Sequence, residues 1–122
     1  MTDSAFDYTG RIARAQAELA DRGIAALLAS IGSDLPYLTG YEAMVSERLT
    51  MAVIPQEGTA TLVVPELEAA RVDARDGLFD VKPWGETDDP VTVVAALCGS
   101  PARIAITDQT WSVFLLGLQQ AM

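Results

Sequence analysis

The sequence of 122 residues contains no histidine, a single cysteine (Cys98) and a single lysine (Lys82). Without histidine, the Ser-His-Asp and Cys-His types of nucleophilic site are excluded, and so are most zinc sites. One cysteine cannot form a disulfide within the chain. A site built from carboxylates alone remains open.

Positive charge and long apolar runs are also scarce. The 17 acidic residues outnumber the 8 basic ones, which gives a net charge of −9. Nucleic acids need clustered Lys and Arg, and anionic membranes repel an acidic chain, so neither is expected as a partner. The longest apolar run, within residues 22–30, is too short to span a bilayer, and the N-terminus lacks the pattern of a signal peptide. We therefore expect one globular domain in the cytoplasm.

Apolar periodicity and turn residues predict four helices and five strands. The helices are expected over residues 8–22, 66–76, 90–98 and 109–122, and the strands over residues 24–29, 49–55, 59–65, 78–84 and 103–107. This order indicates an α/β fold, a three-layer sandwich in which helices flank a mixed β-sheet.

Several details of this arrangement can be predicted. Residues 24–29 do not alternate in polarity, which is typical of a strand buried on both faces. The turn at residues 56–58 predicts a hairpin, and Lys82 with Pro83 favours an edge strand at residues 78–84. Residues 109–122 carry a wide apolar face and end without a stop signal. Either this helix is buried on both sides or further polypeptide follows it.

The candidate chemical groups mostly favour structural roles. Asp88 and Asp89 precede Pro90, so helix capping is favoured over a metal or acid–base role. Asp108 follows a strand, where α/β proteins bind ligands, but capping is favoured there too. Cys98 is interpreted as a small buried residue, because no cation lies near it in the sequence. The two tryptophans, Trp84 and Trp111, are expected in the core, and no phosphate-binding glycine motif occurs.

Arg48 stands out by its position. It lies between residues 32–42, a run with two tyrosines, and the strand at residues 49–55. An arginine at a strand entrance is suited to bidentate binding of a carboxylate. An ion pair with Glu42 or Glu47 is the alternative, and the residues alone slightly favour it.

Four segments in succession resemble the N-terminal domain of the creatinase/prolidase/aminopeptidase P family. They are RIARAQAELADRGIAALLAS, SDLPYLTGY, ERLTMAVIP and ATLVVPELEAARV, of which Tyr37-Leu38-Thr39-Gly40 is the most recognisable part. The resemblance implies that residues 1–122 form one such domain and that the catalytic pita-bread domain is absent from this chain.

In that family the second domain holds two divalent metal ions, often manganese, cobalt or zinc, through two Asp, one His and two Glu. The metal-dependent members cleave the bond before proline. The resemblance therefore implies the non-catalytic half of an Xaa-Pro dipeptidase, with no metal ligand or catalytic residue in this chain and no activity by itself. The N-terminal domain is expected to serve dimerisation and to shape the active site. Its expected partners are its own catalytic domain and a second copy of the chain.

The resemblance also suggests two substrate-binding residues. Arg48 matches an arginine that holds the substrate carboxylate in creatinase-like members, although Ser46 replaces their phenylalanine. Tyr41 is expected to face the active site and Tyr37 to pack beneath a structural corner at Thr39 and Gly40, in a shaping loop without catalytic groups. The alternative from another class is a stand-alone α/β binding or assembly module. Because the apolar face of residues 111–122 is wide, we also expect self-association.

Overall fold

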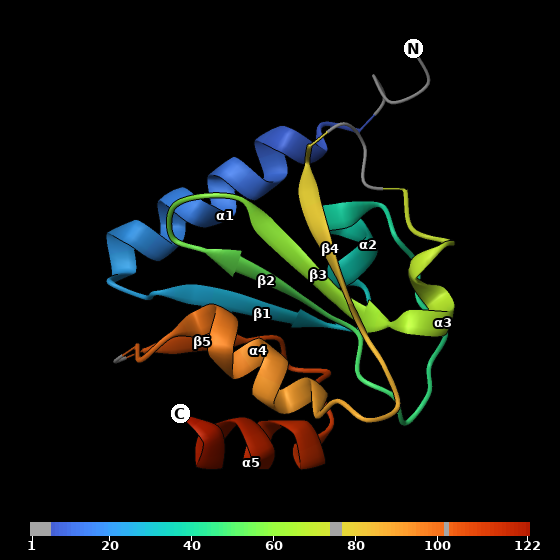
Figure 1. Ribbon diagram of the computed structural model, residues 1–122. Helices are drawn as coiled ribbons and strands as arrows, with labels where there is room; N and C mark the ends of the chain where they lie inside the picture. The colour runs from blue at the N-terminus through green and yellow to red at the C-terminus, as the bar shows by residue number, and fades with distance from the viewer. Residues whose placement is uncertain (1–5, 74–76, 102) are drawn as a thin grey trace.

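The computed structural model describes residues 6–73, 77–101 and 103–122 (Figure 1). The elements follow the expected order, with one additional short helix. They are α1 (Tyr8–Arg22), β1 (Ala26–Ser30), α2 (Asp34–Thr39), β2 (Met51–Pro55), β3 (Ala60–Pro65), α3 (Glu66–Ala69), β4 (Phe79–Trp84), α4 (Pro90–Cys98), β5 (Ile104–Ile106) and α5 (Ser112–Ala121). None of the described helices is long and apolar enough to cross a membrane.

The five strands form one mixed sheet in the order β4-β3-β2-β1-β5. β2 runs antiparallel to both β1 and β3, whereas β5 is parallel to β1 and β4 is parallel to β3. Four strands therefore end, and β2 begins, at the same edge of the sheet (Figure 1). We call this the carboxyl edge. The predicted hairpin β2–β3 and the predicted edge strand β4 are both confirmed.

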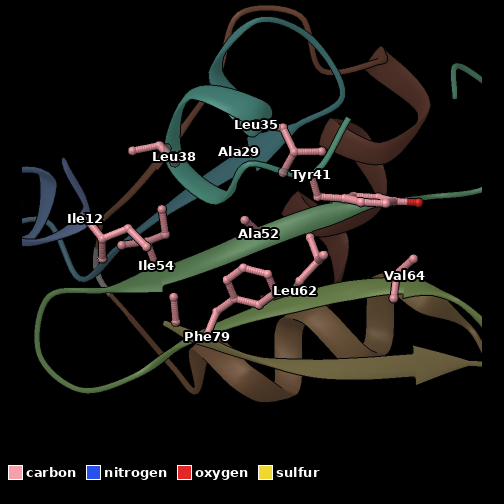
Figure 2. Packing of buried hydrophobic residues seen from close by; sticks show 11 residues of the cluster. Ile12, Ala29, Leu35, Leu38, Tyr41, Ala52, Ile54, Leu62, Val64 and Phe79 are labelled. Carbon is pink, nitrogen blue, oxygen red and sulfur yellow. The ribbon is translucent and has the colours of Figure 1, made fainter. Parts of the chain in front are cut away.

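Helices cover both faces of the sheet, so the predicted three-layer sandwich is confirmed (Figure 1). One buried cluster, which includes Leu35, Tyr41 and Phe79, lies beneath α1 and α2 (Figure 2). A second cluster, which includes Val94 and Leu118, lies beneath α4 and α5. In β1, four of the five residues are buried, because the sheet is covered from both sides.

The ends of the helices largely follow their sequence signals. The carboxylate of Asp7 accepts a hydrogen bond from the backbone N–H of Gly10 at the start of α1. Gly23 ends this helix with φ of 66°, a left-handed conformation in which a side chain is strained. Asp89 caps α4 by accepting from the N–H of Val91, as predicted.

Two predictions about helices that precede β4 were wrong. Residues 34–39 were expected in a loop but form the helix α2. Residues 66–76 were expected to be one helix, yet α3 ends at Ala69, because Arg71 and Val72 donate to carbonyls only three residues back and its four residues bury no side chain. The last part of that expected helix, residues 74–76, lies outside the described residues.

The final helix also starts later than expected. α5 begins at Ser112, because residues 107–110 form a turn in which the N–H of Thr110 donates to the carbonyl of Thr107. Asp108 lies in this turn and does not cap a helix. Trp111 was expected in the core but is 46% exposed, whereas Trp84 is buried as predicted. Tyr37, expected to be packed, is 53% exposed, since its ring faces the guanidinium of Arg11 at 4.0 Å.

Candidate functional site

Arg48 lies at the carboxyl edge, in the connection that leads from α2 to β2. Its backbone N–H donates to the hydroxyl of Ser46 at 3.1 Å, which fixes the chain immediately before the strand. Neither Glu42 nor Glu47 forms an ion pair with Arg48 among the described residues. The interpretation of Arg48 as part of such a pair was therefore wrong. Arg48 is partly buried, and without an acidic partner in the described part of the chain its guanidinium is available to an anion.

A small hollow opens beside Arg48, with a volume of about 60 Å³. We call it the Arg48 notch. Its lining residues come from the ends of β1 and β5, the connection before β2 and the start of α5: Ser30, Ile31, Val45, Ser46, Arg48, Thr50, Gln109, Trp111 and Phe114. About 10–15 Å³ of such a volume holds one water molecule, so the notch admits a group of a few heavy atoms, such as a carboxylate, rather than a whole dipeptide.

Hydroxyl groups hold the wall of the notch in place. The hydroxyl of Thr107 accepts from the N–H of Ser30 at 3.0 Å, and the hydroxyls of Ser30 and Thr110 are 2.7 Å apart. The hydroxyl of Thr110 also donates to the carbonyl of Thr107 at 2.9 Å. These bonds tie the turn after β5 to the end of β1, and thereby position the residues that follow the turn.

Gln109, in the same turn, lies directly over Gly32. A Cβ atom at Gly32 would come within 2.0 Å of Oε1 of Gln109. Gly32 also has φ of 156°. A side chain at Gly32 would therefore be strained and would also displace the side chain of Gln109.

Tyr41, the second predicted site residue, lies in the cluster beneath α1 and α2 (Figure 2). Its hydroxyl donates to Oε1 of Glu68 at 2.8 Å. Burial, with the hydrogen bond and charge of Glu68 adding to it, raises the pKa of Tyr41 to about 12. The structure does not bring Tyr41 and Arg48 into one pocket, because Arg48 borders the second cluster on the opposite side of the sheet, beside Leu49 and Phe114.

Other reactive groups do not converge on a centre. Within the described part of the chain, no three His, Cys, Asp or Glu side chains are close enough to hold a metal ion together. Burial raises the pKa of the Cys98 thiol, which disfavours its reactive thiolate form. The residues described here therefore offer a carboxylate-sized notch but no dinuclear metal site.

Comparison with known proteins places this geometry in a family. The model of the creatinase/prolidase N-terminal domain matches residues 11–122. The chain belongs to this family. It is 40% identical over 119 residues to a protein of Mycobacterium bovis named "Probable dipeptidase PepE", and this match covers 94% of the chain but 32% of the relative.

Solved structures agree with this assignment. The crystal structure of dipeptidase PepE from Mycobacterium ulcerans is 40% identical and superimposes with a TM-score of 0.86, covering 93% of this chain and 32% of that one. A prolidase from Thermococcus sibiricus is 26% identical with a TM-score of 0.82, covering 95% and 32%. This domain of the creatinase/prolidase family thus spans about a third of the length of these relatives.

The sequence singled out Arg48 as a candidate but not the residues that surround it. Thr50, Gln109 and Trp111 line the same notch. Thr50 is only two positions away and sits at a strand entrance, which was an available signal. Gln109 and Trp111 lie about sixty residues further along the chain, and no sequence pattern links them to Arg48.

Proposed function

We propose that this domain is the non-catalytic N-terminal domain of an Xaa-Pro dipeptidase and that its carboxyl edge shapes the active site. The observation that carries the proposal is the 40% identity to the PepE relative over 94% of the chain, together with the coverage of only 32% of that relative. The chemistry then belongs to polypeptide outside this domain, and the domain supplies contacts to the substrate.

Arg48 is the residue that we propose for the carboxylate of the dipeptide. It has no acidic partner among the described residues and borders a hollow of the right size. For Tyr41 we propose a separate contact with the substrate through its hydroxyl, outside the Arg48 notch, although only 8% of the residue is exposed. The hydroxyl is already paired with Glu68, so its contribution is expected to be smaller than that of Arg48.

The proposal assigns the divalent metal pair, manganese, cobalt or zinc, to the catalytic domain. The absence of a three-ligand group from the described residues is consistent with this assignment. Such ions supply a nucleophilic hydroxide and polarise the scissile carbonyl when bound. The residues of this domain would act only by binding and orienting the substrate.

We further propose that the parent protein is a cytoplasmic homodimer in which this domain contributes to the contact. Apolar side chains are exposed along α5, among them Val113 at 65% and Leu116 at 59%. Exposed apolar groups that cluster on one helix favour burial against another surface. Sedimentation of the full-length protein tests this: a monomer at high concentration contradicts the dimer.

The central test uses the full-length protein with Mn²⁺ and an Xaa-Pro dipeptide. We expect hydrolysis that a chelator abolishes. The substitution Arg48→Ala should raise KM about 30-fold, because hydrogen bonds to a charged group contribute about 2 kcal/mol. Arg14→Ala is the matched control, since Arg14 is exposed on α1 and remote from the notch. Absence of hydrolysis, or an equal KM for both variants, contradicts the proposal.

A further inference from the structure

The Arg48 notch is lined by a buried hydroxyl group that has no hydrogen-bond partner among the described residues. Thr50 is only 4% exposed and lines the notch. Its side chain has no hydrogen-bond partner within the described part of the chain, unlike the neighbouring hydroxyls of Ser30 and Thr110, which bond each other. Buried polar side chains in folded proteins nearly always have a partner. An acceptor atom placed in the notch would provide one.

A stacked aromatic pair forms another wall of the same notch. The rings of Trp111 and Phe114 are stacked, with centroids 6.2 Å apart and planes inclined by 13°. Trp111 is 46% exposed although it was expected in the core. The turn that precedes it is fixed by the hydroxyl of Thr110, so this aromatic surface is held in place rather than free to fold inward.

We propose that Thr50 and Trp111 complete a subsite for a carboxylate that is attached to an apolar ring. The carboxylate accepts hydrogen bonds from Arg48 and from the hydroxyl of Thr50, and the ring lies against Trp111. This inference rests on the proposed function for its substrate, a dipeptide that ends in proline. It goes further by naming the second donor and the residue that selects the ring.

The charge of the notch favours a carboxylate over a phosphate. A volume of about 60 Å³ admits a group of a few heavy atoms, which either anion satisfies. One arginine supplies the only positive charge among the lining residues, in a chain whose net charge is −9. A monoanion is therefore matched better than a dianion, which would meet the repulsion of the whole domain.

Binding of a product-like ligand tests the subsite without catalysis. The full-length protein is treated with a chelator and titrated with N-acetyl-L-proline, and then with N-acetyl-L-prolinamide, in which the carboxylate is neutral. We expect tighter binding of the free acid. Thr50→Val, which removes the hydroxyl and keeps the shape, should weaken binding of N-acetyl-L-proline about tenfold. Thr50→Ser should restore most of the affinity.

Matched variants separate this effect from a general loss of structure. Thr61→Val makes the same change in β3, away from the notch, and should leave the affinity unchanged. Trp111→Leu should lower the preference for N-acetyl-L-proline over N-acetylglycine about fourfold, the value of one buried methylene group. Leu97→Ala, on the exposed side of α4 and outside the notch, should not alter this preference. Thermal unfolding of each variant checks that it is folded.

The outcomes distinguish this inference from the proposed function. If Thr50→Val binds N-acetyl-L-proline as tightly as the unmodified protein, Thr50 is not a donor and the inference is overturned. An unchanged ligand preference in Trp111→Leu overturns the role of Trp111. If the full-length protein binds the ligands as expected but hydrolyses no dipeptide, the subsite stands and the proposed function fails. If the full-length protein hydrolyses Xaa-Pro dipeptides but binds the free acid no more tightly than the amide, the subsite is overturned and the dipeptidase activity stands.

Discussion

Replacing Tyr41 by phenylalanine isolates the energetic contribution of one hydroxyl. The ring stays in the cluster beneath α1 and α2, and only the bond of 2.8 Å to Glu68 is lost. A hydrogen bond to a charged group contributes roughly 1.5–3 kcal/mol, but Glu68 is half-buried and regains water. We therefore expect Tyr41→Phe to lower the free energy of unfolding by about 1 kcal/mol. This corresponds to a fall in Tm of about 4 °C for a domain of this size.

The pH dependence of this difference provides a second measurement. The pKa of Tyr41 is raised from its ordinary value of 10.0 to about 12 in the folded state, first by burial and then by Glu68. Since the folded pKa is higher, the stabilisation is complete below pH 10 and is lost as the pH rises towards 12. Two pKa units correspond to at most about 2.7 kcal/mol, and water near Glu68 reduces this value. The stability advantage over Tyr41→Phe should therefore shrink between pH 10 and pH 12.

Urea unfolding of the 122-residue domain at pH 7 and at several alkaline pH values measures both effects. The titration of other groups cancels in the difference between the two proteins. Tyr37→Phe is the matched control, because Tyr37 is 53% exposed and its hydroxyl has no hydrogen bond among the described residues. If Tyr41→Phe and Tyr37→Phe unfold at the same urea concentration at every pH, the hydroxyl of Tyr41 is not coupled to Glu68 and the reasoning fails.

Three further changes can be tested by simple measurements. Asp89→Ala removes the cap that accepts from the N–H of Val91, and should cost about 1 kcal/mol in thermal unfolding followed by circular dichroism; an unchanged Tm contradicts this. Trp84→Phe leaves the buried carbonyl of Leu49 without its donor at 2.9 Å, and should cost about 2 kcal/mol in urea unfolding; no loss of stability refutes it. Because burial raises the pKa of Cys98, its thiol should react with a disulfide reagent at pH 8 more slowly than it does in urea-unfolded protein, and equal rates would be inconsistent with this.

The sheet could be predicted because its strands carry strong local signals. β1 is apolar on both faces, which indicates a buried strand. The short glycine-containing turn at residues 56–58 favours antiparallel pairing of β2 with β3 as a hairpin. Capping was also predictable where an acidic residue directly precedes proline, as at Asp89. In each case the groups that interact are close in the sequence.

Short or weakly amphipathic helices were harder to predict. α2 has six residues and α3 has four, and intrinsic propensity does not define helices of this length. α2 is stabilised by tertiary packing, because Leu35 and Leu38 are buried in the cluster beneath it and Gly40 ends it in a left-handed conformation. The sequence showed these residues but not the surface against which they pack.

By itself the sequence determined the α/β class and the order of the strands along the chain, and it singled out Arg48 as a candidate, since periodicity, caps and charge are local properties. Only the tertiary structure decided that Arg48 has no acidic partner among the described residues, that Tyr41 lies on the other side of the sheet, and that Trp111 borders the notch. The physical reason is the parallel pairing of β1 with β5, which brings the turn at residues 107–110 against the end of β1. The Arg48 notch forms where these distant segments meet.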